Sequence, residues 1–595
     1  MKNKEKVSSF KNYVYMLKFI SKHTPFMVFG YLFFDVLANL PWTLSNVVLL
    51  KYIIDVATEG EALYRVAIAL VLFVAFVVVT NLCTTLFYEV SMPKQKEKLY
   101  FAIYKTIYEK AAKMDYEAYD NPEYYNDLVL AMNSMNERAY AVLSNTQDIL
   151  TNIIGVITIG TVIVTIDPVC LVFVAVCVAI MTPIGRLIAK VNVDRTEAMT
   201  PLDRKNLYFS RVFYLQDYAK ELRLSGAGKM IEDRYNKNIL DRIKTIAPYL
   251  TKQWKLYFCQ ESLPMTILIY LGITLLMGYK AIVTKEVSMG DFAATFNGAA
   301  SISTSVFAIT SQFAISIREN GLYVEKFRRF MNAKEKMVSG TKTTVFDKPV
   351  TIKFENVSFK YPGTEKYVLK NINLEISPYK KIALVGYNGA GKTTLTNLLL
   401  RLYDVTEGVI KVNGVDIRDW DIKAYHKNFA AVFQDFSLFG ATLGENVSMD
   451  DIPDKDKASK ALKAASFNRE LPDGMDSILL KEFDDNGVSL SGGEAQKIAI
   501  SRAFYKNCAF AVLDEPSANL DPVAEYSLNQ SMAKAADSKT VLFISHRLST
   551  TVMADEIYML ENGEIIEHGS HEELMSLDGK YAYMFRLQAE KYAER

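Results

Sequence analysis

A glycine-rich stretch, GYNGAGKTT at residues 386–394, constrains the fold of this chain more than any other feature. It follows the apolar run IALV at 382–385 and precedes the run LTNLLL at 395–400, which predicts a strand, a loop and a helix in that order. Glycines in such a loop let backbone N–H groups surround a phosphate at the positive end of the helix. The predicted phosphate-binding residues are Gly386, Asn388, Gly389, Ala390, Gly391, Lys392, Thr393 and Thr394.

Two side chains of this loop have predicted roles of their own. Lys392 would reach the β- and γ-phosphates of a nucleotide, and the Thr393 hydroxyl would bind Mg²⁺. A glycine-rich turn between a strand and a helix can also serve packing alone. The Lys-Thr pair directly after the last glycine favours the phosphate site.

Composition and cysteine spacing exclude several other classes of protein. The 595-residue chain has a formal net charge of +1, so nothing in its charge suggests a nucleic-acid partner. The cysteines have no C-x-x-C spacing and lie mostly in apolar runs, which predicts buried free thiols rather than disulfides or a metal site. They are Cys83, Cys170, Cys177, Cys259 and Cys508.

Apolar segments long enough to span a membrane occur only before about residue 318. A spanning helix needs about 20 mostly apolar residues. The Lys-rich residues 1–24 contain no signal-peptide cleavage site and predict an amphipathic helix on the cytoplasmic surface of the membrane. An even number of spans returns the chain to that side. The six predicted spans are 26–50, 64–88, 149–166, 169–189, 262–279 and 292–317.

Two charged, helix-forming gaps lie between spans two and three and between spans four and five. Each is long enough to project a helical hairpin roughly 40 Å into the cytoplasm at 1.5 Å per residue. The sequence DNPEYY at 120–125 predicts that a short helix begins at Pro122, at the tip of the first hairpin, and the second tip is expected near 211–221. These could be ordinary solvated helices, but their matched lengths favour contacts with another domain.

A few polar residues interrupt the spans. A carboxylate inside a membrane is costly, so we expect Asp35 to face a wet cavity or a partner group. Serine and threonine in spans more often pack helices together than bind substrate, so the polar sixth span is a weaker hint of a substrate path. Its polar residues are Asn297, Ser301, Ser303, Thr304, Ser305, Thr310, Ser311 and Gln312.

The C-terminal half reads as a linker at 336–350 followed by an α/β domain from residue 351. Tyr361 precedes a proline and could stack on an adenine, although such a tyrosine is often only a turn residue. Gln434 follows a predicted strand. Ser491, Gly492 and Gly493 open a helix and form a second phosphate-binding turn, which would serve a nucleotide held by another copy.

Another predicted strand, at 510–514, ends in two carboxylates. Asp514 is placed to hold Mg²⁺, and Glu515 to orient the attacking water, which is the main residue-specific need of phosphoryl transfer. His546 follows the next strand. A lone histidine at the end of a strand is usually structural, but its place after the carboxylate strand favours a role in catalysis.

These motifs, in this order, resemble those of the ATP-binding cassette (ABC) transporters, specifically the exporter-type half-transporters. Residues 386–394 resemble the Walker A motif, Gln434 the Q-loop, 490–496 the signature, 512–515 the Walker B motif with its catalytic glutamate, 517–521 the D-loop and His546 the switch histidine. Tyr361 resembles the adenine-stacking residue, and 119–126 a first coupling helix. The signature reads LSGGE rather than LSGGQ, which we expect to change little, and 481–487 departs from the usual loop.

The resemblance implies a multidomain membrane protein: a six-helix transmembrane domain (25–335) followed by an α/β P-loop ATPase domain (351–595). It implies ATP and Mg²⁺ as ligands, with Glu515, His546 and Gln434 catalytic and with Thr393, Gln434 and Asp514 around the metal. It also implies a homodimer or heterodimer in a cell membrane, suited to a bacterial inner membrane, exporting a drug, lipid or peptide. Import on the same fold, or a regulatory ATPase without transport, are the alternatives.

Overall fold

The computed structural model describes residues 8–60, 63–481, 483–516, 522–535, 538–545 and 551–593. The chain divides into two compact units. The first comprises Met1–Lys113 and Glu123–Ala333, and the second comprises Met114–Pro122 and Lys334–Arg595. The second unit therefore takes a short segment from the N-terminal half of the chain.

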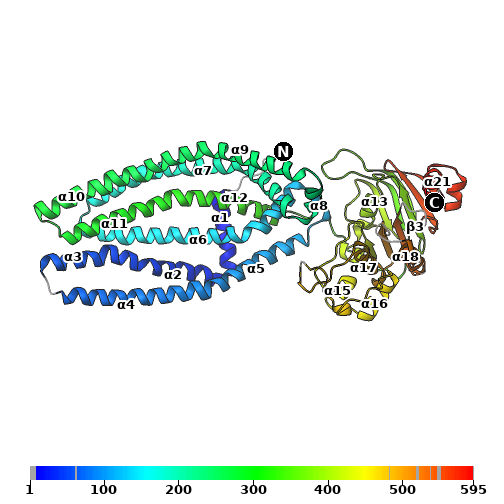
Figure 1. The fold of residues 1–595 in the computed structure, drawn as a ribbon, viewed down its shortest axis with the longest axis horizontal. Helices are drawn as coiled ribbons and strands as arrows, with labels where there is room; N and C mark the ends of the chain where they lie inside the picture. Colours follow the sequence, from blue (N-terminus) through cyan, green and yellow to red (C-terminus); the bar gives the residue numbers. More distant parts are fainter. Residues whose placement is uncertain are drawn as a thin grey trace. The chain divides into compact units, whose positions relative to one another are not determined.

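The first unit is built of long helices, drawn in blue to green in Figure 1. Within the described residues, six of them are long and apolar enough to cross a membrane, as predicted. They are Pro25–Glu59, Tyr64–Ala111, Pro122–Ile166, Cys170–Tyr214, Ala227–Thr284 and Met289–Met331. Each is longer than the predicted apolar segment because the helix continues beyond the apolar stretch into its polar flanks.

Most of these spans combine α-helix with short π-helical turns. Pro41 lies shortly before one such turn and Pro264 directly before another, and a proline inside a helix removes a backbone hydrogen bond. The α-helices are α1 Ser9–His23, α2 Pro25–Thr43, α3 Leu50–Glu59, α4 Tyr64–Leu86, α5 Met92–Ala111, α6 Pro122–Ile166, α7 Cys170–Tyr214, α8 Gln216–Leu224, α9 Ala227–Tyr257, α10 Thr274–Tyr279, α11 Met289–Phe307 and α12 Phe313–Met331. The π-turns are η1 Leu44–Leu49, η2 Phe87–Ser91, η4 Phe258–Ser262, η5 Met265–Ile273, η6 Lys280–Thr284 and η7 Ala308–Gln312.

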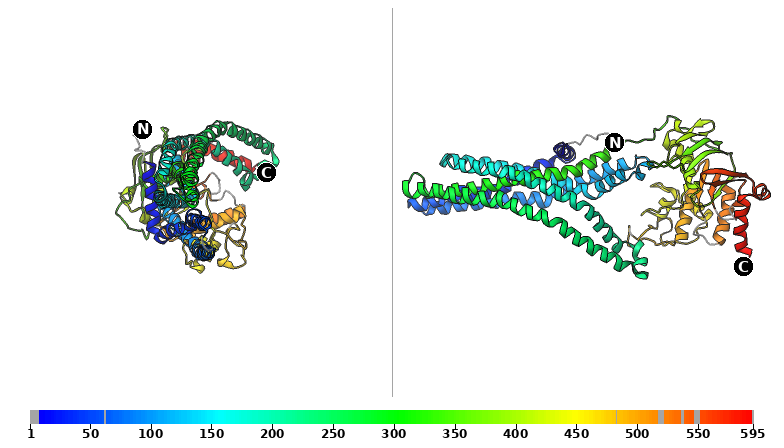
Figure 2. Two further views of the ribbon diagram at one scale, coloured as in Figure 1. Left: turned by 90° about the vertical axis from the view of Figure 1, so that its left-hand side faces the viewer. Right: turned by 90° about the horizontal axis from the view of Figure 1, so that it is seen from above.

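The two hairpins end where the sequence indicated. Helix α6 begins at Pro122 but is 45 residues long, so the prediction of a short helix there is wrong in length. The short helix α8 joins α7 to α9 at the second tip. Figure 2 shows α7 and α9 running together away from the other helices toward α8. A small separate core of Phe209, Val212 and Ile231 holds this end of the pair together.

Helix α1 lies against other helices of the first unit rather than standing alone. Tyr13, Met16 and Ile20 on one of its faces are almost completely buried. The Tyr13 hydroxyl donates to the Val142 carbonyl at 2.7 Å, and the Asn12 amide donates to the Gly321 carbonyl at 3.3 Å. The amphipathic pattern predicted for this segment is therefore used for packing on α6 and α12.

Asp35 has polar partners on two helices. The Thr151 hydroxyl of α6 donates to its carboxylate, and the Asn39 amide donates to it at 3.3 Å. In the sixth span, Ser301, Thr304 and Thr310 donate to carbonyls of their own helix. These hydroxyls have their hydrogen-bond acceptors in the backbone of their own helix, which favours a role in helix packing over one in substrate binding. The cysteines are free thiols: Cys170, Cys177 and Cys508 are buried as predicted, Cys83 is half-buried, and Cys259 is exposed, contrary to the prediction.

The second unit contains two sheets. The antiparallel sheet has the order β2-β1-β4-β5, and the larger sheet has the order β10-β9-β3-β8-β7-β6. Strands β9, β3, β8, β7 and β6 run parallel, and β10 is antiparallel to β9. The strands are β1 Ile352–Phe359, β2 Leu369–Ile376, β3 Lys381–Gly386, β4 Glu407–Val412, β5 Val415–Asp416, β6 Phe429–Val432, β7 Phe510–Asp514, β8 Thr540–Ile544, β9 Glu556–Glu561 and β10 Glu564–Gly569.

Strand β3 separates two hydrophobic cores because alternate side chains of a strand point to opposite faces. Ile382 and Leu384 belong to one core, shared with α13 and the antiparallel sheet, and Ala383 and Val385 to the other, shared with α17 and α18. The helices are η3 Tyr116–Asp120, α13 Lys392–Leu399, η8 Ile417–Asp419, α14 Ile422–Lys427, α15 Leu443–Ser448, α16 Lys455–Ala464, η9 Gly474–Asp476, α17 Gly492–Tyr505, α18 Pro522–Ala535, α20 His571–Ser576 and α21 Lys580–Ala593.

Candidate nucleotide-binding site

The glycine-rich loop joins the end of β3 to the start of α13, as its flanking runs predicted. Gly386, Gly389 and Gly391 have φ values of +146°, +80° and +107°, which residues with side chains rarely adopt. A Cβ at Gly386 would lie 2.2 Å from the Leu560 carbonyl oxygen, and one at Gly391 would lie 2.6 Å from Leu369. Nothing approaches a Cβ placed at Gly389, so that glycine is needed for its φ rather than for space.

Lys392 is largely buried beneath this loop, with 8% of its surface exposed. Its ammonium donates to the carbonyls of Gly386 at 2.8 Å and Tyr387 at 3.1 Å. Burial lowers the pKa of Lys392, and the nearby carboxylates of Glu515 and Asp514 partly oppose that shift. A phosphate in the loop would supply the negative charge that keeps this ammonium protonated.

Thr393 and Asp514 come together at the carboxyl end of the parallel strands. The Thr393 hydroxyl donates to the Asp514 carboxylate at 3.1 Å. Asp514 is 4% exposed at the end of β7, and burial raises its pKa. A hydroxyl beside a buried carboxylate fits Mg²⁺, which takes oxygen ligands and is usually held by one or two carboxylates together with substrate phosphates. A cation there would also offset the cost of burying the charged carboxylate.

Glu515 follows directly, with a backbone conformation that non-glycine residues seldom adopt. Its φ is +48°, and its N–H donates to the Ile544 carbonyl at 3.1 Å. The Gln496 amide of α17 donates to the Glu515 carbonyl at 3.2 Å. Strained residues of this kind persist only where the surroundings hold them, and they gather at functional sites. These bonds hold the Glu515 backbone, and its carboxylate interacts electrostatically with Lys392 and Asp514.

The signature turn forms the N-terminus of α17 through a capping box. The Ser491 hydroxyl accepts from the Glu494 N–H at 3.3 Å, and the Glu494 carboxylate accepts from the Ser491 N–H at 2.8 Å. Arg469 donates to the same carboxylate at 3.1 Å. Hydrogen bonding to the Ser491 backbone lowers the pKa of Glu494. Glu494 therefore caps the helix, while Ser491 and Gly492 remain exposed to solvent.

The remaining predicted residues are placed as follows. The Tyr361 hydroxyl forms a 2.9 Å hydrogen bond with the Thr394 hydroxyl, which brings this tyrosine to the glycine-rich loop. Gln434 and Asn388 are exposed, whereas Ala390 is buried. His546 and residues 517–521 lie outside the described residues. The structure thus brings together Lys392, Thr393, Asp514 and Glu515, with Tyr361 at Thr394, and it places the signature turn on a separate helix.

Sequence reasoning missed several residues around this site. Gln496 holds the backbone of Glu515, and Arg469 pairs with Glu494. Tyr403 and Arg401 follow α13 and contact chain segments outside the α/β fold, as described below. Of these residues, Gln496 alone could have been found from the sequence, because it lies on the helix that begins at the signature motif.

The chain resembles known proteins at two levels. Residues 369–518 match the family model described as "ABC transporter". An ATP-dependent lipid A-core flippase of Methylobacillus flagellatus is 41% identical over 243 residues, 40% of this chain and 41% of that protein. The Subtilin transport ATP-binding protein SpaT of Bacillus subtilis is 28% identical over 493 residues, 80% of this chain and 78% of that protein. The chain thus spans about two fifths of the length of the flippase it matches.

A solved structure resembles the whole fold. A bacterial Atm1-family ABC exporter with ATP bound superposes with a TM-score of 0.75 at 24% identity, covering 95% of this chain and 98% of that one. At that identity the likeness establishes the fold: a six-helix region fused to an α/β domain.

Proposed function

We propose that this ABC transporter chain, with six membrane-spanning helices fused to a nucleotide-binding domain, is one half of an ATP-driven exporter that works as a dimer. The observation that carries the proposal is the grouping of Lys392, Thr393, Asp514 and Glu515 around one glycine-rich loop. These residues supply a phosphate cradle, a metal ligand pair and a carboxylate for water. Together they meet the needs of phosphoryl transfer from ATP to water.

Each residue has a defined task in the proposed reaction. Backbone N–H groups of the loop and the Lys392 ammonium hold the β- and γ-phosphates. Thr393 and Asp514 would hold Mg²⁺, which neutralises charge on the phosphate oxygens. Glu515 accepts a hydrogen bond from the attacking water and orients it toward the γ-phosphorus. His546 and Gln434 are proposed to contact the γ-phosphate side of the site.

The exposed signature turn supports dimerisation. Ser491 and Gly492 present a capped helix N-terminus to solvent, and the described hydrogen bonds of Ser491 are with Glu494 and Ala495 of α17. A second chain could place its nucleotide against this turn, so that two ATP molecules lie between two chains. Closure of the two ATPase domains would then drive the membrane helices. Whether the partner is an identical or a related chain is for the experiment below to decide.

The substrate is proposed to be amphipathic: a lipid, a drug-like compound or a peptide. The relatives support this range, since they are described as lipid A-core flippases, a subtilin transporter and a putative multidrug exporter. The described spans are apolar, and a bacterial inner membrane is the proposed location, with the ATPase domain in the cytoplasm.

The test is Mg-ATPase activity of the full chain in lipid nanodiscs beside Glu515→Gln, which keeps the side-chain size and removes the carboxylate. We expect the variant to lose at least a hundredfold in rate, the scale at which single catalytic groups act. Activity in the wild type alone would identify a self-sufficient homodimer. A silent but folded wild type that gains activity with a related half-transporter would identify a heterodimer. Equal activity of wild type and Glu515→Gln would refute the assignment.

A further inference from the structure

The segment 114–122 at the tip of the first hairpin, here called the tip segment, belongs to the same compact unit as the nucleotide-binding domain. Tyr403 is one of the residues that contact it there. The Tyr403 hydroxyl donates to the Asp120 carboxylate at 2.5 Å, and its ring lies edge-on to the Tyr116 ring at 5.6 Å. Only 3% of Tyr403 is exposed. The contact is therefore a buried ring and a charge-assisted hydrogen bond, which is stronger than an ordinary one.

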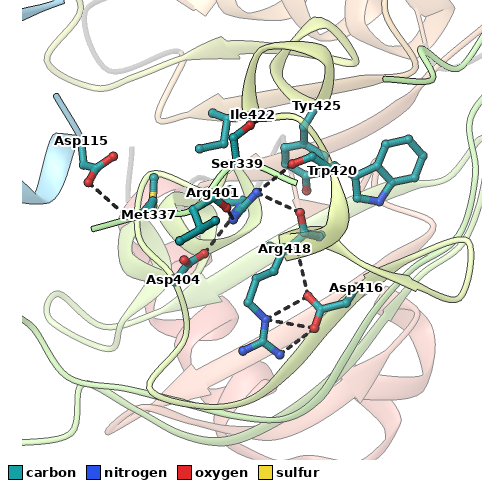
Figure 3. A network of polar contacts seen from close by, with 12 residues as sticks. Asp115, Met337, Ser339, Arg401, Asp404, Asp416, Arg418, Trp420, Ile422 and Tyr425 are labelled. Atoms are coloured by element: carbon teal, nitrogen blue, oxygen red, sulfur yellow. Dashed lines mark hydrogen bonds and ion pairs between the residues drawn. The ribbon is translucent and has the colours of Figure 1, made fainter. Parts of the chain in front are cut away.

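The linker after α12 holds the other end of the tip segment. The Asp115 carboxylate accepts from the backbone N–H groups of Lys336 at 2.5 Å and Met337 at 3.1 Å. The Lys336 ammonium also pairs with Glu117. Figure 3 shows Asp115 reaching the linker at Met337, beside the buried Arg401. The tip segment is thus held at both ends within this unit.

Arg401 fastens the same linker to the domain. Its guanidinium, 1% exposed, donates to the carbonyls of Val338 at 2.8 Å and of Ile417 and Trp420 at 3.1 Å each. Its Nε donates to Asp404 at 3.1 Å. Figure 3 shows these bonds radiating from one side chain. The linker is therefore a fixed part of this domain at Val338 rather than a free tether.

Arg401 and Tyr403 lie in one turn, at the end of the helix that the phosphate loop begins. Helix α13 runs from Lys392 to Leu399, about 12 Å at 1.5 Å per residue. Arg401 has a φ of +49°, and the Arg401 and Leu402 N–H groups donate back to Leu398 and Asn397. Because the turn is bonded to the helix, a shift of α13 moves Arg401 and Tyr403 with it.

Tyr403 also contacts Tyr361, the tyrosine predicted to stack on adenine. The Tyr361 and Tyr403 rings lie edge to face at 5.4 Å, and Phe359 packs on Tyr403 at 5.5 Å. The Tyr361 hydroxyl is bonded to Thr394 in the first turn of α13. Tyr403 therefore contacts, directly or through one residue, the loop that binds phosphate, the tyrosine predicted to stack on adenine, and the tip segment.

We propose that Tyr403 is a positioning residue that makes the tip segment respond to nucleotide, through its hydroxyl bond to Asp120 and its ring contact with Tyr361. The proposal rests on the proposed function and extends it, because it names the residue by which ATP in the site acts on the membrane-spanning half. The described side-chain contacts of Tyr403 are with Asp120, Tyr116, Phe359 and Tyr361, and not with the proposed phosphate and metal ligands Lys392, Thr393 and Asp514. Its loss should spare ATP binding and remove the response of the tip segment.

The experiment uses the full chain carrying Glu515→Gln in nanodiscs, with Mg-ATP as the probe. Affinity is measured with a fluorescent ATP analogue, and amide hydrogen exchange is followed in peptides covering residues 114–122. We expect ATP to slow exchange there by about threefold or more, and Tyr403→Phe or Asp120→Ala to remove most of that slowing. The dissociation constant for ATP should stay within about twofold, since a lost hydrogen bond at Asp120 does not touch the nucleotide.

Tyr558→Phe is the matched control. The Tyr558 hydroxyl donates to Glu556 at 2.8 Å in the same domain, without contact to the tip segment. We expect this variant to respond to ATP as the parent does. The double variant of Tyr403→Phe with Asp120→Ala should behave as either single variant, because both remove the same bond. A full response in the two single variants, or a loss in all variants including the control, would overturn the proposal. A parent chain that binds no ATP would overturn the proposed function and this inference together.

Discussion

Arg401→Met should destabilise the nucleotide-binding unit far more than a change to an average surface arginine. Methionine keeps most of the buried stem but none of the donors. The carbonyls of Ile417 and Trp420 would lose their described guanidinium bonds inside the protein, and the Val338 carbonyl would lose its own at the linker. A buried acceptor left without a donor costs about 1–3 kcal/mol.

The expected loss is about 3 kcal/mol in the free energy of unfolding, because removing a buried cation also removes its desolvation cost and offsets part of the lost bonds. For a domain of this size that corresponds to a fall of about 6–12 °C in melting temperature. The Arg401→Lys variant should recover part of the loss, since an ammonium can donate to some of these carbonyls but lacks the planar fork.

Trp420 provides the assay. It accepts one of the Arg401 bonds through its carbonyl, and its ring packs edge-on against Phe346 at 5.2 Å. The other tryptophans, Trp42 and Trp254, can be changed to phenylalanine in the full chain, so that fluorescence reports on the nucleotide-binding unit alone. Urea unfolding in detergent then gives the free energy for each variant.

Arg418→Met is the matched control. Arg418 pairs with Asp416 at 2.6 Å, but its side chain is 46% exposed, and exposed ion pairs contribute about 0–1 kcal/mol. The reasoning would be refuted if Arg401→Met cost no more than Arg418→Met. It would also be refuted if Arg401→Lys were fully as stable as the parent chain.

Three further outcomes are expected. Asp514→Asn keeps an acceptor for Thr393 but loses the charge, so half-maximal ATPase should need at least about tenfold more Mg²⁺, read from a magnesium titration. Glu494→Gln should stay within about twofold of the parent ATPase rate, because its amide oxygen can still accept the Ser491 N–H, whereas Glu494→Ala should lose several-fold. Burial lowers the pKa of His426, so the folded state binds its proton more weakly and stability should fall below about pH 6.5; His426→Gln should flatten that part of a melting curve series.

The sequence was most informative where a function needs particular residue types at fixed spacing. The glycines, Lys392 and Thr393 could be assigned because a phosphate loop tolerates few alternatives. Asp514 could be assigned because a carboxylate at the end of a buried strand is costly to bury and therefore indicates a functional role. Their meeting at 3.1 Å follows from the order of the parallel strands, which the sequence could only suggest.

Contacts between distant segments could not be predicted in the same way. Asp120 and Tyr403 are separated by 283 positions, and nothing in either neighbourhood indicates the other. The sequence predicted an apolar face on α1. It could not predict whether lipid or other helices would cover Tyr13 and Met16 on that face. Glu494 was expected to change little, and the structure adds that it caps its helix and pairs with Arg469.

The division of the chain into units limits where two such proteins can be recombined. The nucleotide-binding unit is discontinuous: it includes Met114–Pro122 as well as everything from Lys334 onward. A recombination event, or a designed chimaera, that joins two transporters at a single point near residue 334 would pair Tyr403 and Lys336 of one parent with Asp120 and Glu117 of the other. Modular inheritance of this unit therefore requires two crossovers, or a tip segment that already suits both parents.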